Sequence, residues 1–337
     1  GAGSNAWAVS PSKSTTGSVL LANDPHLPLT LPPIWFLSHL RCPNLNVIGP
    51  TFPGLPVIVL GHNERIAWGC TNVHADTVDL FRIRQNPKNE GQYEFNGSWR
   101  EFERISDPIP VKDRKEPLDF EVLITYFGPI VKSFEMDDHL YEIDLPDMLA
   151  LRWSSKDGSL ADTLEGFLRI NRASNWKEFG EALRLLTINP QNFTYGDVEG
   201  NIGLQQAGRV PMRQHGDGAT ITPGTSDRFD WKGLCTFERL DSRYNPDSGI
   251  LYNANYNENK EINGLLLAQD RDDPHRTRRL NVLLHSKERF SQEDFKQFQL
   301  DVHSQEAEEI LPLFLGILDE DSMSEDLQEV ISLLKDW

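Results

Sequence analysis

Cysteine is scarce in this sequence, with three in 337 residues. Cys42, Cys70 and Cys235 lie far apart in the chain and allow at most one internal disulfide. Nor do they come in the closely spaced pairs of a structural zinc site. We therefore exclude a disulfide-rich scaffold and a cysteine-based metal centre, and expect buried or incidental thiols.

Basic residues are outnumbered as well. The chain has 33 Lys and Arg against 51 Asp and Glu, which gives a formal net charge of −18. A protein that binds nucleic acid or an anionic membrane surface needs a basic patch, and this balance opposes both kinds of partner. The remaining composition, 38% hydrophobic and 25% charged, is ordinary for a globular protein.

Long apolar runs are also missing. A helix that crosses a bilayer needs about 20 consecutive apolar residues. The longest candidate, Ile310–Leu318, is roughly half that length. We predict that it forms a buried helix segment rather than a membrane span.

The sequence has no G-x-S-x-G elbow to place a serine beside a base. Ser4 offers another route to nucleophilic catalysis. If the bond between Gly3 and Ser4 is cut, the new α-amino group has a pKa of about 7.7–8.0 and is partly neutral at physiological pH. It can then accept the hydroxyl proton, directly or through one water, so that one residue supplies nucleophile and base.

Several short motifs follow Ser4 in a definite order. They are Ser4–Trp7, Leu21–Leu27, Pro53–Pro56, Gly61–Gly69, Thr71–Asp76, Asn253–Asn255 and His275–Arg279. Together, over residues 4 to about 305, they resemble the β-chain portion of the penicillin acylase (penicillin amidase) family of N-terminal nucleophile (Ntn) hydrolases. In that family a precursor cuts itself just before the serine.

The resemblance implies an α+β fold, part of a four-layer αββα sandwich with a β-rich excursion. We assign residues 1–80 to the nucleophile hairpin and core strands and residues 81–155 to the excursion. Residues 156–337 supply helices and further core strands of the same domain.

The resemblance also implies catalytic roles. The backbone N–H of Val73 and the side-chain amide of Asn255 would form the oxyanion hole, whereas the nearby Asn253 and Asn257 do not match the family's asparagine. Arg276 and His26 would orient the serine amine and the asparagine. The Val73 side chain, with Trp35 and Phe36, would border the acyl pocket, although aromatic residues here are equally consistent with a core.

Asp76, Val78 and Asp79 form a D-x-V-D pattern. Ca²⁺ prefers such a shell of carboxylate and carbonyl oxygens, and family members with this pattern bind calcium here. A solvated turn is the alternative. We expect no organic cofactor.

Local patterns predict several elements. Residues 5–9 and 17–22 suit a hairpin, and Val47–Phe52, Val57–Leu60 and Ile66–Trp68 suit strands. Residues 161–187 have helical periodicity, with Ser174 as an expected N-cap, and Asp273–Ser286 reads as a further helix. Ser291–Asp294 matches a capping box.

These observations favour an N-acyl amide hydrolase that works through an acyl-enzyme. The substrate is a β-lactam side-chain amide or another small N-acyl amide; the alternative is a long-chain acyl-homoserine lactone or a lipopeptide. A non-catalytic precursor fragment, with Gly1–Gly3 still attached, is the competing class. The resemblance further implies an α chain of the same precursor as partner and a periplasmic or secreted location.

Overall fold

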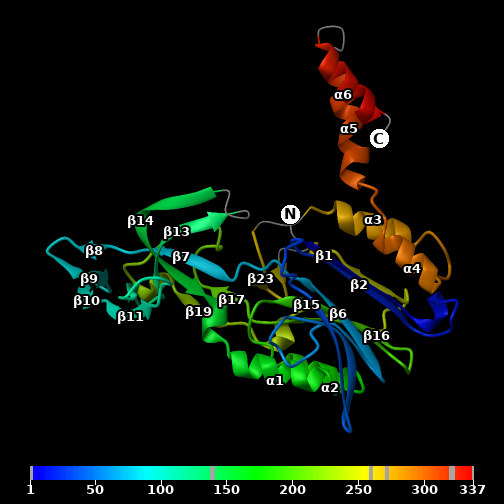
Figure 1. The fold of residues 1–337 in the computed structure, drawn as a ribbon, viewed down its shortest axis with the longest axis horizontal. Coiled ribbons are helices and arrows are strands. Elements are labelled where there is room, and N and C mark those ends of the chain that lie inside the picture. Colours follow the sequence, from blue (N-terminus) through cyan, green and yellow to red (C-terminus); the bar gives the residue numbers. More distant parts are fainter. Residues whose placement is uncertain (1–2, 137–140, 258–260, 270–272, 319–322, 336–337) are drawn as a thin grey trace.

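A computed structural model of the chain describes residues 3–136, 141–257, 261–269, 273–318 and 323–335 (Figure 1). At its centre β1 (Gly3–Val9) runs antiparallel to β2 (Leu20–His26) on one side and to β21 (Ile250–Asn253) on the other. The predicted N-terminal hairpin is confirmed. It places Ser4 on the middle strand of this three-stranded sheet.

A second, seven-stranded sheet packs against the first. Its order is β20-β16-β15-β6-β5-β4-β3. The strands span β3 Phe36–Cys42, β4 Leu45–Thr51, β5 Gly61–Asn63, β6 Ile66–Asn72, β15 Gln191–Asp197, β16 Ile202–Ala207 and β20 Ser242–Tyr244. Between the sheets, Ala8 and Leu251 of the first pack against Ile202 and Leu204 of the second.

The prediction of a strand at Val57–Leu60 is wrong. The segment is buried, but the N–H groups of Val59 and Leu60 both donate to the single carbonyl of Pro50 instead of entering a ladder. The strand β5 begins only at Gly61, where φ is +151° and an added Cβ would lie 2.1 Å from the Ile48 carbonyl oxygen. Glycine therefore permits the close crossing of β4 and β5.

Helices α1 (Leu160–Ile170) and α2 (Trp176–Leu183) cover the outer face of the seven-stranded sheet (Figure 1). Phe179 and Leu183 of α2 are fully buried against Phe193 of β15 and Trp68 of β6, in one apolar cluster. This burial is the main source of stability for two short helices.

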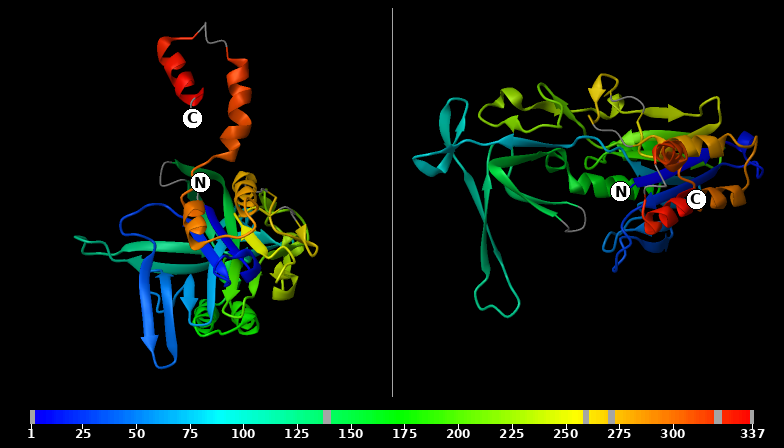
Figure 2. Two further views of the ribbon diagram at one scale, coloured as in Figure 1. Left: turned by 90° about the vertical axis from the view of Figure 1, so that its right-hand side faces the viewer. Right: turned by 90° about the horizontal axis from the view of Figure 1, so that it is seen from above.

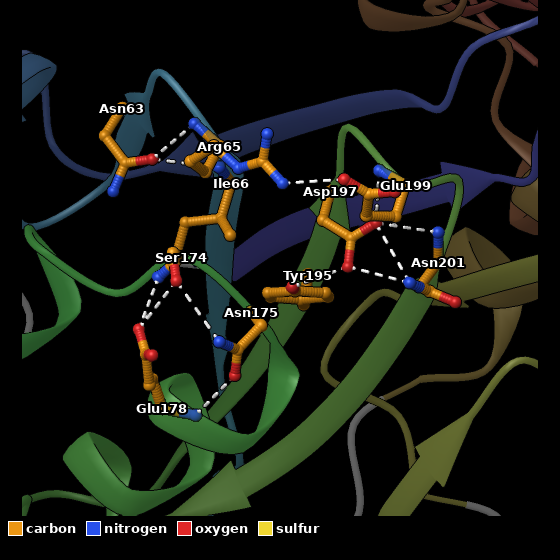
Figure 3. Close-up of polar contacts among 10 residues, drawn as sticks. All are labelled: Asn63, Arg65, Ile66, Ser174, Asn175, Glu178, Tyr195, Asp197, Glu199 and Asn201. Atoms are coloured by element: carbon orange, nitrogen blue, oxygen red, sulfur yellow. Dashed lines mark hydrogen bonds and ion pairs between the residues drawn. The ribbon is translucent and has the colours of Figure 1, made fainter.

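The N-cap of α2 is Asn175, not the expected Ser174, as Figure 3 shows. The Asn175 side chain accepts from the Glu178 backbone N–H at 3.0 Å, while Ser174 donates through its N–H and hydroxyl to the Glu178 carboxylate. Figure 3 also shows the β15–β16 turn, where Tyr195 donates to Asp197 at 2.8 Å. Burial, and secondarily Asp197, raise the pKa of the Tyr195 phenol, as expected for a structural side chain.

Helices α3 (His275–Leu284) and α4 (Gln292–Gln299) cover the other sheet. Leu280, Leu284 and Phe295 are buried against Trp7 of β1 and its neighbours. The predicted capping box at the start of α4 is confirmed, since Ser291 and Asp294 exchange side-chain-to-backbone hydrogen bonds.

The β-rich part is a set of smaller sheets joined to the core through β7 (Figure 1). Phe81 of β7 stacks on Phe127 in its apolar cluster. Asn96-Gly97 forms the turn between β9 and β10, with both residues at positive φ. The strands are β7 Val78–Arg82, β8 Gln85–Asn86, β9 Asn89–Phe95, β10 Ser98–Glu101, β11 Glu103–Ile109, β12 Leu118–Ile124, β13 Ile130–Met136, β14 Tyr141–Trp153 and β18 Thr222–Pro223.

The three cysteines are free thiols. Two further pairs of short strands lie between β16 and α3 in the chain. The pairs are β17 Pro211–Arg213 with β19 Trp231–Leu234, and β22 Glu261–Ile262 with β23 Leu265–Leu266.

Helices α5 (Gln305–Ile317) and α6 (Glu325–Lys335) project away from the two sheets, as Figures 1 and 2 show. The apolar run Ile310–Leu318 is therefore helical but not buried as predicted, with Leu313 70% and Ile317 80% exposed. Periodicity identified the helix but not what it packs against. In the part of the chain that the structure describes, no helix is long and apolar enough to span a bilayer.

Candidate active site

Ser4 is buried on β1, with 8% of its surface exposed. Its backbone N–H donates to Oδ1 of Asn255 at 2.6 Å, although 251 residues separate the two. Its hydroxyl donates to the Gly3 carbonyl oxygen at 2.7 Å. The hydroxyl thus lies against the carbonyl group of the one peptide bond whose cleavage would free the Ser4 amine.

Asn255 follows β21 and adopts a left-handed backbone conformation, with φ of +68°. Its Oδ1 accepts from Ser4 and from the Arg276 guanidinium at 3.0 Å, while its Nδ2 donates to the Asn72 carbonyl at 2.8 Å. Because a primary amide carries two N–H donors, one remains for a substrate oxygen.

Arg276 lies in the first turn of α3 and contacts both sides of Ser4. Its Nη1 donates to the Ser4 carbonyl and to Oδ1 of Asn5, each at 3.0 Å, and its Nη2 reaches Asn255. A Cβ added to Gly3 would lie 2.8 Å from Nη2. The glycine before Ser4 therefore leaves the space that the guanidinium occupies.

His26 ends β2, where it pairs in register with Gly3. Its Nε2 lies 2.9 Å from a carboxylate oxygen of Asp24. The structure thus places His26 on the strand beside the Gly3–Ser4 bond and next to an acidic partner. The Asp24 partner was not anticipated from the sequence, although it lies in the same motif.

Val73 is nearly fully buried, and its backbone N–H donates to the Pro190 carbonyl at 3.1 Å. In this structure the predicted oxyanion donor is therefore used within the sheet. Backbone groups of an antiparallel ladder alternate between facing the partner strand and facing away. Since Val73 faces β15 and Asn72 pairs with Gln191, the N–H of Asn72 faces away from β15.

The Asn72 carbonyl also faces away from β15, and it accepts from Asn255. The backbone of Asn72 thus lies beside the Asn255 amide, a placement that was missed from the sequence. The residue is part of the Thr71–Asp76 motif, but only the phase of the ladder distinguishes it from Val73.

The family of the chain follows from its similarity to known sequences. The sequence profile described as Penicillin amidase matches residues 2–337. The chain belongs to the penicillin amidase family. This confirms the family predicted from the motifs.

Several curated penicillin amidase relatives are similar to the chain. The acyl-homoserine lactone acylase QuiP of Pseudomonas aeruginosa is 32% identical over 76% of this chain and 30% of its own length. Penicillin G acylase of Escherichia coli is 32% identical over 77% of this chain and 29% of its own. The chain spans about a third of the length of these relatives.

Among solved structures, the thermostable penicillin G acylase from Alcaligenes faecalis is similar, with a TM-score of 0.80 and 25% sequence identity. The match covers 99% of this chain and 59% of that one. The mixed α/β architecture of a penicillin G acylase is therefore present here.

The three side chains expected at the acyl pocket of this penicillin amidase family member lie in different surroundings. Trp35 stacks on Phe52 with ring centroids 4.7 Å apart, and Phe36 on β3 is 60% exposed. Val73 packs in a buried cluster with Val210 and Leu267. Their role as acyl-pocket residues stays a prediction.

The residues expected to bind calcium hold an arginine. Arg213 donates to both carboxylate oxygens of Asp79 at 2.8–3.1 Å, and the Trp231 indole N–H donates to Asp79 at 2.5 Å. Arg213 also donates to the Asp76 carbonyl at 2.7 Å, and Asp76 Oδ2 accepts from the Gln269 N–H. The side chains of Arg213 and Asp79 are 5% and 6% exposed.

This arrangement does not fit Ca²⁺, because both carboxylate oxygens of Asp79 and the Asp76 carbonyl already accept from the Arg213 guanidinium, whose positive charge opposes a cation there. Among the described residues, no group of three or more His, Cys, Asp and Glu side chains is placed to hold a metal ion.

We expect the melting temperature to be the same in CaCl₂ and in EDTA, measured by calorimetry. A site occupied at 100 times its Kd would add about 2.7 kcal/mol and raise the melting temperature. Arg213→Met should instead destabilise the protein by about 3–5 kcal/mol, because it leaves the Asp79 carboxylate buried and unpaired. A wild-type melting temperature that falls in EDTA would contradict this interpretation.

Proposed function

We propose that the protein is an N-acyl amide hydrolase whose nucleophile is Ser4, freed when the chain cuts its own Gly3–Ser4 bond. The observation that carries the proposal is the contact of Ser4 N–H with Asn255 Oδ1 at 2.6 Å, with Arg276 bonded to both residues. These contacts support the proposal, because the nucleophile, its future amine base and the oxyanion donor would then lie within hydrogen-bond reach of one another.

Self-cleavage begins with attack of Ser4 Oγ on the Gly3 carbonyl carbon. The C–O bond forms, the C–N bond breaks, and the nitrogen takes the hydroxyl proton, which leaves an ester. Water then hydrolyses the ester and releases the Gly3 carboxylate, the Ser4 hydroxyl and a free Ser4 amine.

In turnover, the freed amine takes the Ser4 hydroxyl proton while Oγ attacks the substrate carbonyl. The second N–H of Asn255 Nδ2 and a backbone N–H stabilise the oxyanion. The sequence predicts Val73 as that backbone donor; because the Val73 N–H bonds to Pro190 here, the N–H of Asn72, which faces away from β15, is a second candidate. The leaving amine takes the proton, and water then releases the acid from the acyl-enzyme.

Arg276 has two roles in this scheme. By donating to Asn255 Oδ1 it keeps the amide turned so that Nδ2 is the donor. Its positive charge beside the Ser4 amine favours the neutral amine, which is the form that acts as base. His26, which is in register with Gly3 and bonded to Asp24, would orient the amine.

The wider proposal follows the family. The two sheets with helices on each outer face would form the partial αββα sandwich of the Ntn hydrolases. An α chain from the same precursor would complete the enzyme, in the periplasm or outside the cell.

Substrate choice lies between a β-lactam side-chain amide, or another small N-acyl amide, and a long-chain acyl-homoserine lactone or lipopeptide. QuiP relatives from several Pseudomonas strains support the lactone alternative; the likeness to two penicillin G acylases supports the first. We expect a clear preference in kcat/KM between phenylacetyl amides and long-chain acyl-homoserine lactones. Preference for phenylacetyl substrates would contradict the lipid-acyl alternative; hydrolysis of neither would contradict the proposed activity.

A further inference from the structure

A chain of buried polar side chains lies directly behind Asn255. Asn253, Thr71, Asn192 and Gln206 are at most 9% exposed, and each comes from a different strand, namely β21, β6, β15 and β16. Buried polar groups must be hydrogen-bonded, because each unpaired one is costly. The cluster therefore has fixed partners.

The bonds converge on one atom. Oδ1 of Asn253 accepts from the Thr71 hydroxyl at 2.6 Å, from the backbone N–H of Asn255 at 2.8 Å and from Nδ2 of Asn192 at 3.4 Å. Two of these three donors belong to the surrounding sheet, and the third is the main chain of the proposed oxyanion residue.

The bond from the Asn255 N–H to Asn253 Oδ1 closes an Asx turn, in which a side-chain oxygen accepts from the N–H two residues later. This bond ties the main chain of Asn255 to Asn253, while asparagine itself tolerates the left-handed conformation that Asn255 adopts, with φ of +68°. The direction of the Asn255 side chain is set by this backbone. Asn253 therefore determines where the Asn255 amide points.

The orientation of the Asn192 amide is fixed in turn. Its Oδ1 accepts from Nε2 of Gln206 at 2.9 Å, and Oε1 of Gln206 accepts from the backbone N–H of Asp241 at 3.2 Å. Nδ2 of Asn192 must therefore face Thr71 and Asn253. Every amide in the series has one orientation, which makes the support for Asn255 rigid.

We propose that Asn253 is the positioning residue for the oxyanion donor Asn255, and that Thr71 and Asn192 hold Asn253 in place. This inference rests on the proposed function, because it assigns Asn255 to the oxyanion hole. It adds residues that act on catalysis through Asn255 and touch neither substrate nor Ser4.

Thr71 gives a matched pair of variants in the full-length protein. Thr71→Val keeps the branched shape but removes the hydroxyl donor, while Thr71→Ser keeps the donor. Because small displacements of a catalytic group cost up to about 10²-fold in rate, we expect Thr71→Val to lower kcat about tenfold and Asn253→Ala about 10²-fold. KM should change less than about twofold, and Thr71→Ser should restore kcat.

A second readout separates positioning from a general loss of stability. Phenylboronic acid forms a tetrahedral adduct with a serine and tests the oxyanion hole, whereas the carboxylic acid product tests ground-state binding. In Thr71→Val and Asn253→Ala, the affinity for phenylboronic acid should fall by the same factor as kcat, and the affinity for the product should not change.

Asn255→Ala distinguishes the possible failures. If Asn255→Ala is impaired while Thr71→Val and Asn253→Ala keep wild-type kcat, the positioning inference is wrong and the proposed function survives. If Asn255→Ala itself keeps wild-type kcat, the assignment of Asn255 to the oxyanion hole is wrong and the positioning inference falls with it, whereas the proposed activity fails only if the wild-type protein hydrolyses no N-acyl amide. A loss of kcat with unchanged phenylboronic acid affinity would also overturn the inference.

Discussion

Replacing Ser4 with alanine is expected to lower the rate of N-acyl amide hydrolysis on the order of 10⁶-fold, as loss of a nucleophile does in other acyl-transfer enzymes. The Ser4 hydroxyl is the only group in the proposed mechanism that bonds to the substrate carbonyl. Neither Asn255 nor Arg276 can replace it, since Asn255 accepts from the Ser4 N–H, Arg276 donates to Ser4 and Asn255, and neither side chain is a nucleophile.

Ser14→Ala is the matched control for this experiment. Ser14 is also fully buried, but its hydroxyl bonds to Thr16 instead of the Asn255 cluster. Steady-state kinetics should show wild-type kcat for Ser14→Ala. A Ser4→Ala variant that keeps more than a few per cent of the wild-type rate would contradict the assignment of the nucleophile.

Replacing Asn255 with alanine is expected to lower kcat about 10²- to 10³-fold, the usual loss on removing one oxyanion donor. KM should change little, because the bond to the substrate oxygen strengthens as negative charge develops in the transition state. The substitution also removes the acceptor for the Ser4 N–H and for Arg276, so the measured loss includes some disorder of the nucleophile.

A neighbouring asparagine provides the control. Asn257 donates through Nδ2 to the Val73 carbonyl at 3.1 Å, and the proposed mechanism gives it no contact with Ser4. Asn257→Ala should keep kcat within a few-fold of wild type in the same assay. Equal losses in the two variants would contradict the assignment of Asn255 and indicate a general disturbance of the loop after β21.

Part of this site could be predicted from the sequence because its residues stand in ordered motifs. The motifs predict Ser4, Asn255 and Arg276 as site residues, and the structure brings the three into hydrogen-bond contact. The N-terminal hairpin and the capping box at Ser291 were predictable for a different reason, since alternation and capping chemistry are local.

Other features depend on long-range pairing, which local patterns do not contain. The Val73 backbone faces Pro190 because of the register of β6 on β15, and side-chain types carry no signal for a backbone donor. Arg213 pairs with Asp79 from 134 residues away. The Asp76–Asp79 pattern alone therefore could not predict that an arginine would bond to these oxygens.

The same limit explains the Asn253 cluster. Of the residues around Asn253, Thr71 belongs to a motif, Thr71–Asp76. Asn192 and Gln206 belong to none. Their proposed role becomes visible only when the strands bring Thr71 and Asn192 to Oδ1 of Asn253 and Gln206 to Asn192. A sequence that alternates polar and apolar residues predicts the strands, but not which polar side chains face inward and pair.

The central claim is that the chain cuts its own Gly3–Ser4 bond, and intact mass with N-terminal sequencing of the purified full-length protein tests it most directly. We predict that the wild-type protein contains a chain that begins at Ser4, whereas Ser4→Ala keeps Gly3 joined to residue 4. If the wild-type protein also keeps that bond, Ser4 has no free amine, and a non-catalytic precursor becomes the better description. If Ser4→Ala is cut at the same bond, another protease does the cutting and self-cleavage is contradicted.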